Sequence, residues 1–203
     1  MHKPLFVTGV GTDIGKTLVS AILVEKLKCD YWKPVQSGDL DNSDTMKVQK
    51  LVTNTQTVFH SEAYRLTQPY SPHKSAALDG IEINEQTIIA PKTYNQLLIE
   101  GAGGLMVPLN DHFLVIDLIK QLDAEVILVS QNYLGSINHT LLSIEALKSR
   151  SITIKGIIFN GDENTSTEDY IINYTDVKHL GRVPILPVID KKTITDAGEY
   201  ISL

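Results

Sequence analysis

The feature that most constrains the fold of this chain is a glycine-rich turn between an apolar run and a helix-like segment. The apolar run covers residues 5–8, and the helix-like pattern covers residues 16–27. The turn reads Gly9-Val10-Gly11-Thr12-Asp13-Ile14-Gly15-Lys16-Thr17. It departs from the usual phosphate-loop template at Val10, where that template has glycine. Glycines let backbone N–H groups approach phosphate oxygens, and a helix N-terminus adds its dipole. The turn therefore predicts a phosphate site; a tight turn with an incidental lysine is the alternative.

The rest of the chain alternates strand-like and helix-like segments. Apolar runs occur at residues 5–8, 31–34, 96–99, 126–129 and 154–159, and helix-like patterns at residues 16–27, 43–52, 116–122, 137–148 and 167–179. Runs without strict alternation are typical of parallel strands covered on both faces. We therefore predict an α/β fold of the P-loop NTPase type, with a doubly wound, mostly parallel sheet flanked by helices. A chain of 203 residues fits one domain, here residues 1–203.

Composition narrows the classes of partner. The net charge is −6 and the isoelectric point about 5.5, so no overall basic field attracts nucleic acid or anionic lipid. Residues 126–144 are uncharged, but polar side chains interrupt them, which argues against a transmembrane helix. One cysteine, Cys29, excludes an internal disulfide framework. The first apolar run lacks the length of a signal peptide. We expect a cytoplasmic protein that binds neither nucleic acid nor membrane.

Two lysines are candidates for charge stabilisation. Lys16 can neutralise the β- and γ-phosphates of a nucleotide. Lys33 is expected to end the second strand, before Pro34, and can stabilise negative charge that develops during phosphoryl transfer. Without its neighbouring motif, Lys33 would be an ordinary solvated lysine.

Three oxygen donors are candidates for a magnesium site. The Thr17 hydroxyl closes the phosphate loop, and magnesium prefers a few hard oxygen ligands together with waters and phosphates. Glu100 ends an apolar run before a glycine turn, where a carboxylate is costly to bury without a cation. Asp44 is a further candidate, although Asn42-Ser43-Asp44 is also a good helix-capping sequence.

In order along the chain, the motifs resemble those of dethiobiotin synthetases. The matches are Gly11-Thr12-Asp13-Ile14-Gly15-Lys16-Thr17, Lys33-Pro34-Val35-Gln36-Ser37-Gly38, Asn42-Ser43-Asp44, Ser71-Pro72-His73, Glu100-Gly101-Ala102-Gly103-Gly104, Gly135-Ser136-Ile137-Asn138-His139 and Val183-Pro184. The resemblance runs from residue 5 to about residue 200. It implies an ATP- and magnesium-dependent cyclo-ligase of biotin biosynthesis. Such an enzyme closes the ureido ring of dethiobiotin from 7,8-diaminopelargonate and CO2 through a phosphorylated carbamate.

The resemblance also implies roles for individual residues. Lys16 and Lys33 are the expected catalytic residues, and Thr17, Asp44 and Glu100 the expected metal ligands. The nucleotide would contact Asp13, Ile14, Gly15, Lys16, Thr17, Leu18, Glu100, Gly101, Ala102, Gly103, Asn160, Gly161, Pro184, Ile185 and Leu186. The substrate would contact Thr12, Ser37, Gly135, Ser136, Ile137 and Asn138. The last four would bind its carboxylate tail across a homodimer interface, although an ordinary helix start is an equally good interpretation of that segment. The chain has Lys191 where some members carry an acidic residue near the nucleotide.

Other functions share the expected fold. Regulatory or partitioning ATPases of the deviant Walker-A type carry an extra lysine early in the loop, where this chain has Gly11. P-loop amidating enzymes of the cobyrinate group usually carry a glutaminase domain, for which this chain has no room. A nucleotide-binding module without catalysis would not need paired metal carboxylates. Fold class alone does not separate these alternatives.

Overall fold

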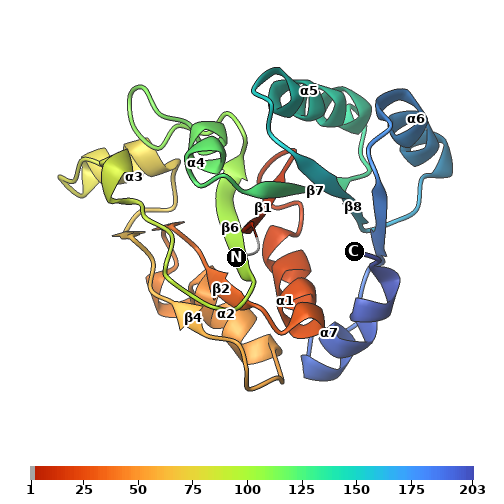
Figure 1. Cartoon of the computed structure of the whole chain (residues 1–203), viewed down its shortest axis with the longest axis horizontal. Coiled ribbons are helices and arrows are strands. Elements are labelled where there is room, and N and C mark those ends of the chain that lie inside the picture. The colour runs from red at the N-terminus through yellow and green to blue at the C-terminus, as the bar shows by residue number, and fades with distance from the viewer. Residues whose placement is uncertain (1–2) are drawn as a thin grey trace.

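A parallel β-sheet forms the centre of the protein in the computed structural model, which describes residues 3–203. Its seven strands lie in the order β4-β2-β6-β1-β7-β8-β9 (Figure 1). They are β1 (Leu5–Gly9), β2 (Asp30–Trp32), β4 (Phe59–His60), β6 (Leu97–Gly104), β7 (Glu125–Gln131), β8 (Ile154–Asn160) and β9 (His179–Val183). Each strand pairs in parallel with its neighbours. A second parallel pair consists of β3 (Val35–Ser37) and β5 (Tyr64–Leu66).

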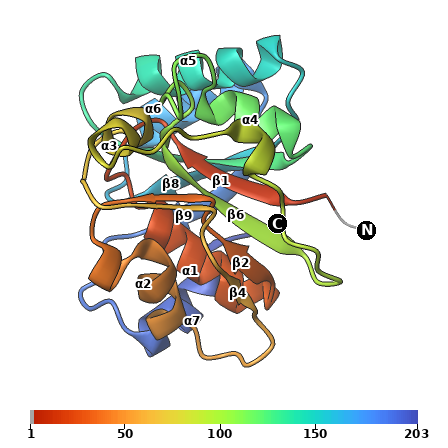
Figure 2. The ribbon, with the colours of Figure 1, turned by 90° about the vertical axis from the view of Figure 1, so that its left-hand side faces the viewer.

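Helices cover both faces of the sheet, as Figure 2 shows in side view. One layer holds α1 (Lys16–Leu27), α2 (Asp44–Leu51) and α7 (Lys191–Ala197). The other layer holds α3 (Pro72–Leu78), α4 (Val115–Gln121), α5 (Ser136–Ser149) and α6 (Thr165–Thr175). This arrangement confirms the predicted doubly wound α/β fold. No helix within residues 3–203 is long and apolar enough to cross a membrane.

Alternate residues of each central strand enter different hydrophobic cores. In β1, Phe6 packs in the core shared with α4 and α5, whereas Val7 packs in the core shared with α1. In β6, Ile99 packs in the first of these cores and Leu98 in the second. Because successive side chains of a strand point to opposite faces, and both faces are covered, these strands have no polar face. Burial on both sides therefore explains the continuous apolar runs.

Three sequence-based boundaries were wrong. The strand expected at residues 31–34 is β2, which ends at Trp32, so Lys33 lies just after the strand and not inside it. The helix expected at residues 167–179 is α6, which begins at Thr165 after the Asn164 cap and ends at Thr175, so that His179 already belongs to β9. The strand expected at residues 96–99 continues to Gly104, so Glu100 lies inside β6 and not at its end. The glycines after Glu100 are thus strand residues, where a turn was expected.

The carboxyl ends of the parallel strands bring the motifs to one edge of the sheet. The phosphate loop follows β1, Lys33 follows β2, and Asn160 ends β8. In open α/β sheets, ligands bind along this edge. The candidate site is therefore built here.

Candidate active site

The phosphate loop is held against the neighbouring strands by backbone and side-chain hydrogen bonds. Val10 N donates to Val129 O at 3.1 Å, and Asn160 Nδ2 donates to Ile14 O at 3.0 Å. Gly15 has a φ of 91°, and a Cβ at this position would lie 2.1 Å from Asn160 Nδ2. Only glycine fits there without displacing the asparagine. The loop thus presents the start of α1, whose first backbone N–H groups lack intrahelical acceptors.

Lys16 is a buried ammonium group whose hydrogen-bond partner belongs to the loop itself. Its Nζ donates to Gly11 O at 2.9 Å, and the residue is only 7% exposed. Burial, reinforced by the nearby Lys33 ammonium, lowers the pKa of Lys16 to about 8. A phosphate bound in the loop would offer this ammonium a charged and therefore stronger acceptor than the carbonyl.

Glu100 accepts hydrogen bonds from three different segments. Its Oε1 accepts from Thr17 Oγ1 at 2.8 Å and from Lys33 Nζ at 3.1 Å, while its Oε2 accepts from Tyr31 Oη at 2.9 Å. The Glu100 side chain is 0% exposed. Burial and the adjacent carboxylate raise the pKa of Tyr31 well above its ordinary value. Tyr31 therefore remains a donor at neutral pH.

Lys33 lies between two carboxylates. Its Nζ is 2.7 Å from Asp44 Oδ2 and 3.1 Å from Glu100 Oε1. Burial opposes the ammonium, but Glu100 and Asp44 outweigh it, and the pKa of Lys33 lies above its ordinary value. Burial likewise opposes the Asp44 carboxylate, but Lys33 outweighs it and lowers the pKa of Asp44. The cap of α2 is Ser43, whose Oγ accepts from Met46 N at 3.4 Å, so the Asp44 side chain is available to Lys33.

One cavity of about 710 Å³ collects most of these groups. Its volume lies within the usual range of roughly 300–1,000 Å³ for small-molecule sites. The sequence-predicted residues on its wall are Thr12, Asp13, Gly15, Lys16, Thr17, Lys33, Ser37, Asp44, Glu100, Ala102 and Gly103. Ser37 Oγ is buried and has no hydrogen-bond partner within the described part of the chain, so it can serve a ligand. Ile14, Leu18 and Gly101 do not line this cavity.

The oxygen donors on the cavity wall fit magnesium. Thr17 supplies a hydroxyl, and Asp44 and Glu100 supply carboxylates, the hard ligands that this ion prefers. Among residues 3–203, no group of three or more His, Cys, Asp or Glu is placed to hold a metal. A magnesium ion would therefore need phosphate oxygens and waters to complete its coordination. This donor set suits a metal that arrives with a nucleotide.

The predicted base-contacting residues form a second group, beside the phosphate loop. Asn160 and Val183 pair across β8 and β9, and Gly161 N donates to Val183 O at 2.8 Å. The following residues 184–186 thus lie at the same edge as Asn160, which itself contacts the loop through Ile14 and Gly15. Ile185 is 66% exposed, so its apolar side chain is free to contact a ligand at this edge.

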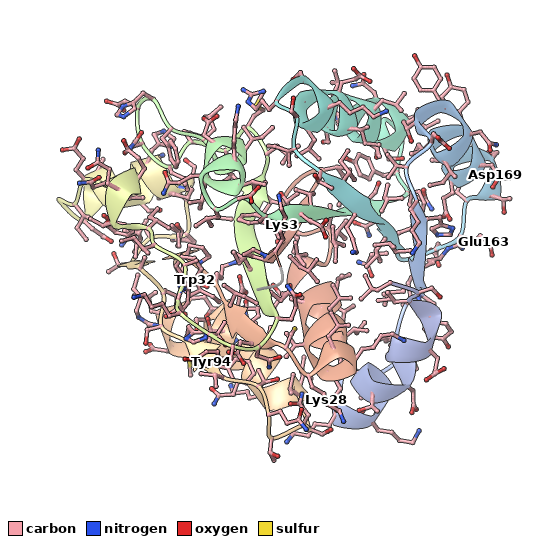
Figure 3. The ribbon with its side chains drawn as sticks, in the orientation of Figure 1. Lys3, Lys28, Trp32, Tyr94, Glu163 and Asp169 are labelled. Atoms are coloured by element: carbon pink, nitrogen blue, oxygen red, sulfur yellow. The ribbon has the colours of Figure 1, made fainter. Side chains whose placement is uncertain are left out.

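The predicted tail-binding residues lie apart from the lysines. Residues 135–137 line a different cavity of about 480 Å³, together with Glu163. Figure 3 labels Glu163 and Trp32, the residue before Lys33, on opposite sides of the molecule. Ser136 N already donates to Tyr133 O at 2.9 Å. Of the first N–H groups of α5, those of Ile137 and Asn138 therefore remain for a ligand, because N–H groups in the first turn have no acceptor within the helix. Within one subunit, the structure does not bring these residues to Lys33.

The sequence-based prediction missed three polar contacts of the site. Tyr31 binds Glu100, and Gln36 links the Gly38 carbonyl at 2.9 Å to the Asp44 N–H at 3.2 Å. Residues 69–72 add a further wall to the main cavity. The sequence places Tyr31 on the same face as Lys33 of the strand expected at residues 31–34, because residues two apart on a strand share a face, but it does not indicate Glu100 as the partner of Tyr31.

Comparison with known proteins gives sequence relatives over nearly the whole chain. A family model described as an AAA domain matches residues 3–193. The ATP-dependent dethiobiotin synthetase BioD of Christiangramia forsetii is 54% identical over 98% of this chain and 96% of its own length. That of Cytophaga hutchinsonii is 50% identical over 95% of this chain and 94% of its own.

Solved structures share the fold at much lower identity. The septum site-determining protein MinD of Pyrococcus horikoshii OT3, complexed with Mg-ADP, has a TM-score of 0.65 at 15% identity, over 97% of this chain and 86% of its own. A ParA family ATPase from Chlorobium tepidum TLS has a TM-score of 0.59 at 15% identity, over 98% of this chain and all of its own. These confirm the P-loop NTPase type of fold. The sequence relatives are far more similar, and by them this chain belongs to the dethiobiotin synthetase family.

Proposed function

We propose that this chain is an ATP-dependent dethiobiotin synthetase that acts on 7,8-diaminopelargonate and CO2. The observation that carries the proposal is the convergence of Lys16, Lys33 and Ser37 on one cavity beside the phosphate loop, where the Ser37 hydroxyl has no hydrogen-bond partner among residues 3–203. Family membership supports the same activity.

The reaction proceeds by phosphoryl transfer to a carbamate. One substrate amine adds to CO2 and loses a proton, which gives the carbamate. A carbamate oxygen then attacks the γ-phosphorus of ATP, and the bond from that phosphorus to the ADP oxygen breaks. The second amine attacks the carbonyl carbon and loses a proton, and inorganic phosphate departs as the ureido ring closes. No step requires a nucleophilic side chain, so the protein acts by positioning and charge stabilisation.

The cavity residues divide this work. Lys16 holds the β- and γ-phosphates, while Lys33 stabilises the charge that develops on the carbamate and the transferred phosphoryl group. Thr12 and Ser37 bind the amine end of the substrate. The N–H groups at the start of α1 and residues 100–103 contact the nucleotide phosphates and sugar, and Asn160 with residues 184–186 contacts the base.

Magnesium is part of the proposal, with Thr17, Asp44 and Glu100 as its protein ligands. Three carboxylates, Asp13, Asp44 and Glu100, face the ammonium groups of Lys16 and Lys33 on the cavity wall. A bound triphosphate would add further negative charge to this wall. The ion would offset that charge and polarise the transferred phosphoryl group.

A homodimer completes the proposed site. The tail-binding residues 135–138 and Lys33 lie apart within one subunit, which supports a tail site contributed by a second subunit. We further propose that residues 1–203 act as one domain in the cytoplasm. The seven-stranded sheet contains strands from β1 to β9, which supports one domain, and the buried free thiol of Cys29 suits a reducing compartment.

A switch-type ATPase is the second candidate, favoured by the fold of the ParA and MinD structures. The test is ADP release by the purified protein with magnesium, measured with and without diaminopelargonate plus bicarbonate, while mass spectrometry follows dethiobiotin. We expect ADP and dethiobiotin in equal amounts, and little ADP without the diamine. Rapid ATP hydrolysis at the same rate with and without the diamine would instead support a switch-type ATPase.

A further inference from the structure

Tyr31 is a buried polar residue that the proposed reaction does not use. It lies on β2, is 0% exposed, and is absent from the wall of the main cavity. Its ring packs near Phe59, with centroids 5.9 Å apart. Its hydroxyl donates to Glu100 Oε2 at 2.9 Å. The hydroxyl therefore contacts a candidate metal ligand from a buried position that is not part of the cavity wall.

The two oxygens of Glu100 have unequal partners. Oε1 accepts from Thr17 and Lys33, whereas Tyr31 is the partner recorded for Oε2 within the described chain. Thr17 and Lys33 both line the cavity, so a bound ligand competes for their hydrogen bonds. Tyr31 does not meet the ligand. Its hydrogen bond can persist through the reaction while the partners of Oε1 change.

We propose that Tyr31 is a positioning residue, whose hydroxyl holds Oε2 of Glu100 so that Oε1 faces Thr17 and the metal position. This inference rests on the proposed role of Glu100 as a magnesium ligand. Partners that orient a ligating carboxylate strongly affect metal affinity, and their loss typically costs about 10–100-fold. A purely structural tyrosine would instead contribute to packing and stability alone.

The test is Tyr31→Phe, which keeps the ring and removes the hydroxyl. Magnesium is titrated into protein and a fluorescent ADP analogue, and binding of the same analogue is measured in EDTA. We expect the apparent dissociation constant for magnesium to rise about tenfold or more, with nucleotide binding in EDTA unchanged. If the parent binds magnesium and the Tyr31→Phe titration superimposes on that of the parent, the inference about Tyr31 is overturned, but the metal assignment is not. A parent without magnesium dependence overturns both the metal assignment and the inference.

Tyr64→Phe is the matched control. The Tyr64 hydroxyl also forms hydrogen bonds, to Thr87 Oγ1 at 2.8 Å and from Asn84 N at 3.0 Å, but it lies outside the cavity. Its removal should change thermal stability and leave the magnesium titration at the parent value. An equal loss of magnesium affinity in both variants would show a general effect of hydroxyl removal, which overturns the inference.

A double-mutant cycle with Glu100→Gln tests whether Tyr31 acts through Glu100. In the Glu100→Gln background, Tyr31→Phe should no longer change magnesium binding; a full effect there overturns the inference. Should Tyr31→Phe fail to fold, the double variant is titrated instead, and a magnesium affinity equal to that of Glu100→Gln supports the inference, because Tyr31 then acts only through the Glu100 carboxylate. Failure of both to fold identifies a packing role and overturns it.

Discussion

Nucleotide binding should take up a proton at Lys16. The ammonium is buried against the Gly11 carbonyl, and its pKa is lowered to about 8. Phosphate oxygens favour the charged form, so a bound nucleotide raises this pKa again. The ligand-free protein thus holds Lys16 partly neutral at mildly basic pH, whereas the complex holds it fully charged.

The size of the effect follows from that pKa. At pH 7, 8 and 9, roughly 0.1, 0.5 and 0.9 of the Lys16 side chains are neutral, and binding takes up the same fraction of a proton. Nucleotide affinity should accordingly fall about tenfold between pH 7 and pH 9, or about 1.4 kcal/mol.

Isothermal titration calorimetry of ADP in buffers of different ionisation enthalpy measures this uptake. Lys16→Arg is the control, because a guanidinium stays protonated throughout this range, and the uptake should disappear. The reasoning is refuted if the parent binds ADP at pH 8 and pH 9 without uptake, or if Lys16→Arg shows the same uptake.

Three further predictions concern the same edge of the sheet. Lys16→Met should lower kcat by about 100-fold or more in steady-state kinetics. It should also raise the melting temperature at pH 7. The folded-state pKa of Lys16 is about 8, below its ordinary value of 10.5, so the buried ammonium destabilises the fold fully below pH 8, and this cost fades as the pH rises toward 10.5. An unchanged melting temperature would contradict the burial argument. Glu100→Gln should shift the magnesium dependence of ADP release to higher concentration, and superimposable titrations would remove Glu100 from the metal site. Asn138→Asp should raise KM for diaminopelargonate and leave KM for ATP nearly unchanged, because the new carboxylate would repel the carboxylate tail of the substrate. Asn138 is chosen because it is exposed at the start of α5, whereas Ser136 is buried. Equal changes in both KM values would exclude the tail site.

The long central strands and α1 could be predicted because burial leaves a direct mark on their sequences. Strands covered on both faces read as apolar runs, and the helix from Lys16 to Leu27 follows a glycine turn that marks its start. The short strands β3, β4 and β5 each include polar side chains, among them Gln36, His60 and Arg65, so no apolar run marks them. Strand β9, with His179, Gly181 and Arg182, carries polar residues and glycine, so no apolar run marked it, and the predicted helix was extended to its first residue, His179.

The main cavity could be predicted in outline because parallel strands place their carboxyl ends together. Lys16, Thr17, Lys33, Asp44 and Glu100 reach one cavity for this reason. The contact between Tyr31 and Glu100 could not be predicted, because it depends on β2 lying next to β6 in the sheet. In the chain, 64 residues lie between the end of β2 and the start of β6. The separation of residues 135–138 from Lys33 likewise depends on the order of strands in the sheet.

The phosphate loop distinguishes a synthetase from a switch ATPase, two functions that share this fold. The ParA and MinD structures share this sheet at 15% identity, and switch ATPases of the deviant Walker-A type carry a lysine where this chain has Gly11. A Cβ at Gly11 would meet no heavy atom within 4 Å, so packing does not forbid a side chain there. The second ammonium of this cavity comes instead from Lys33, at the end of β2, on the wall that also carries Ser37. Lys33 thus lies on the cavity wall outside the phosphate loop, where an acceptor of the phosphoryl group would lie. That placement suits an enzyme with a second substrate better than a switch that only hydrolyses its nucleotide.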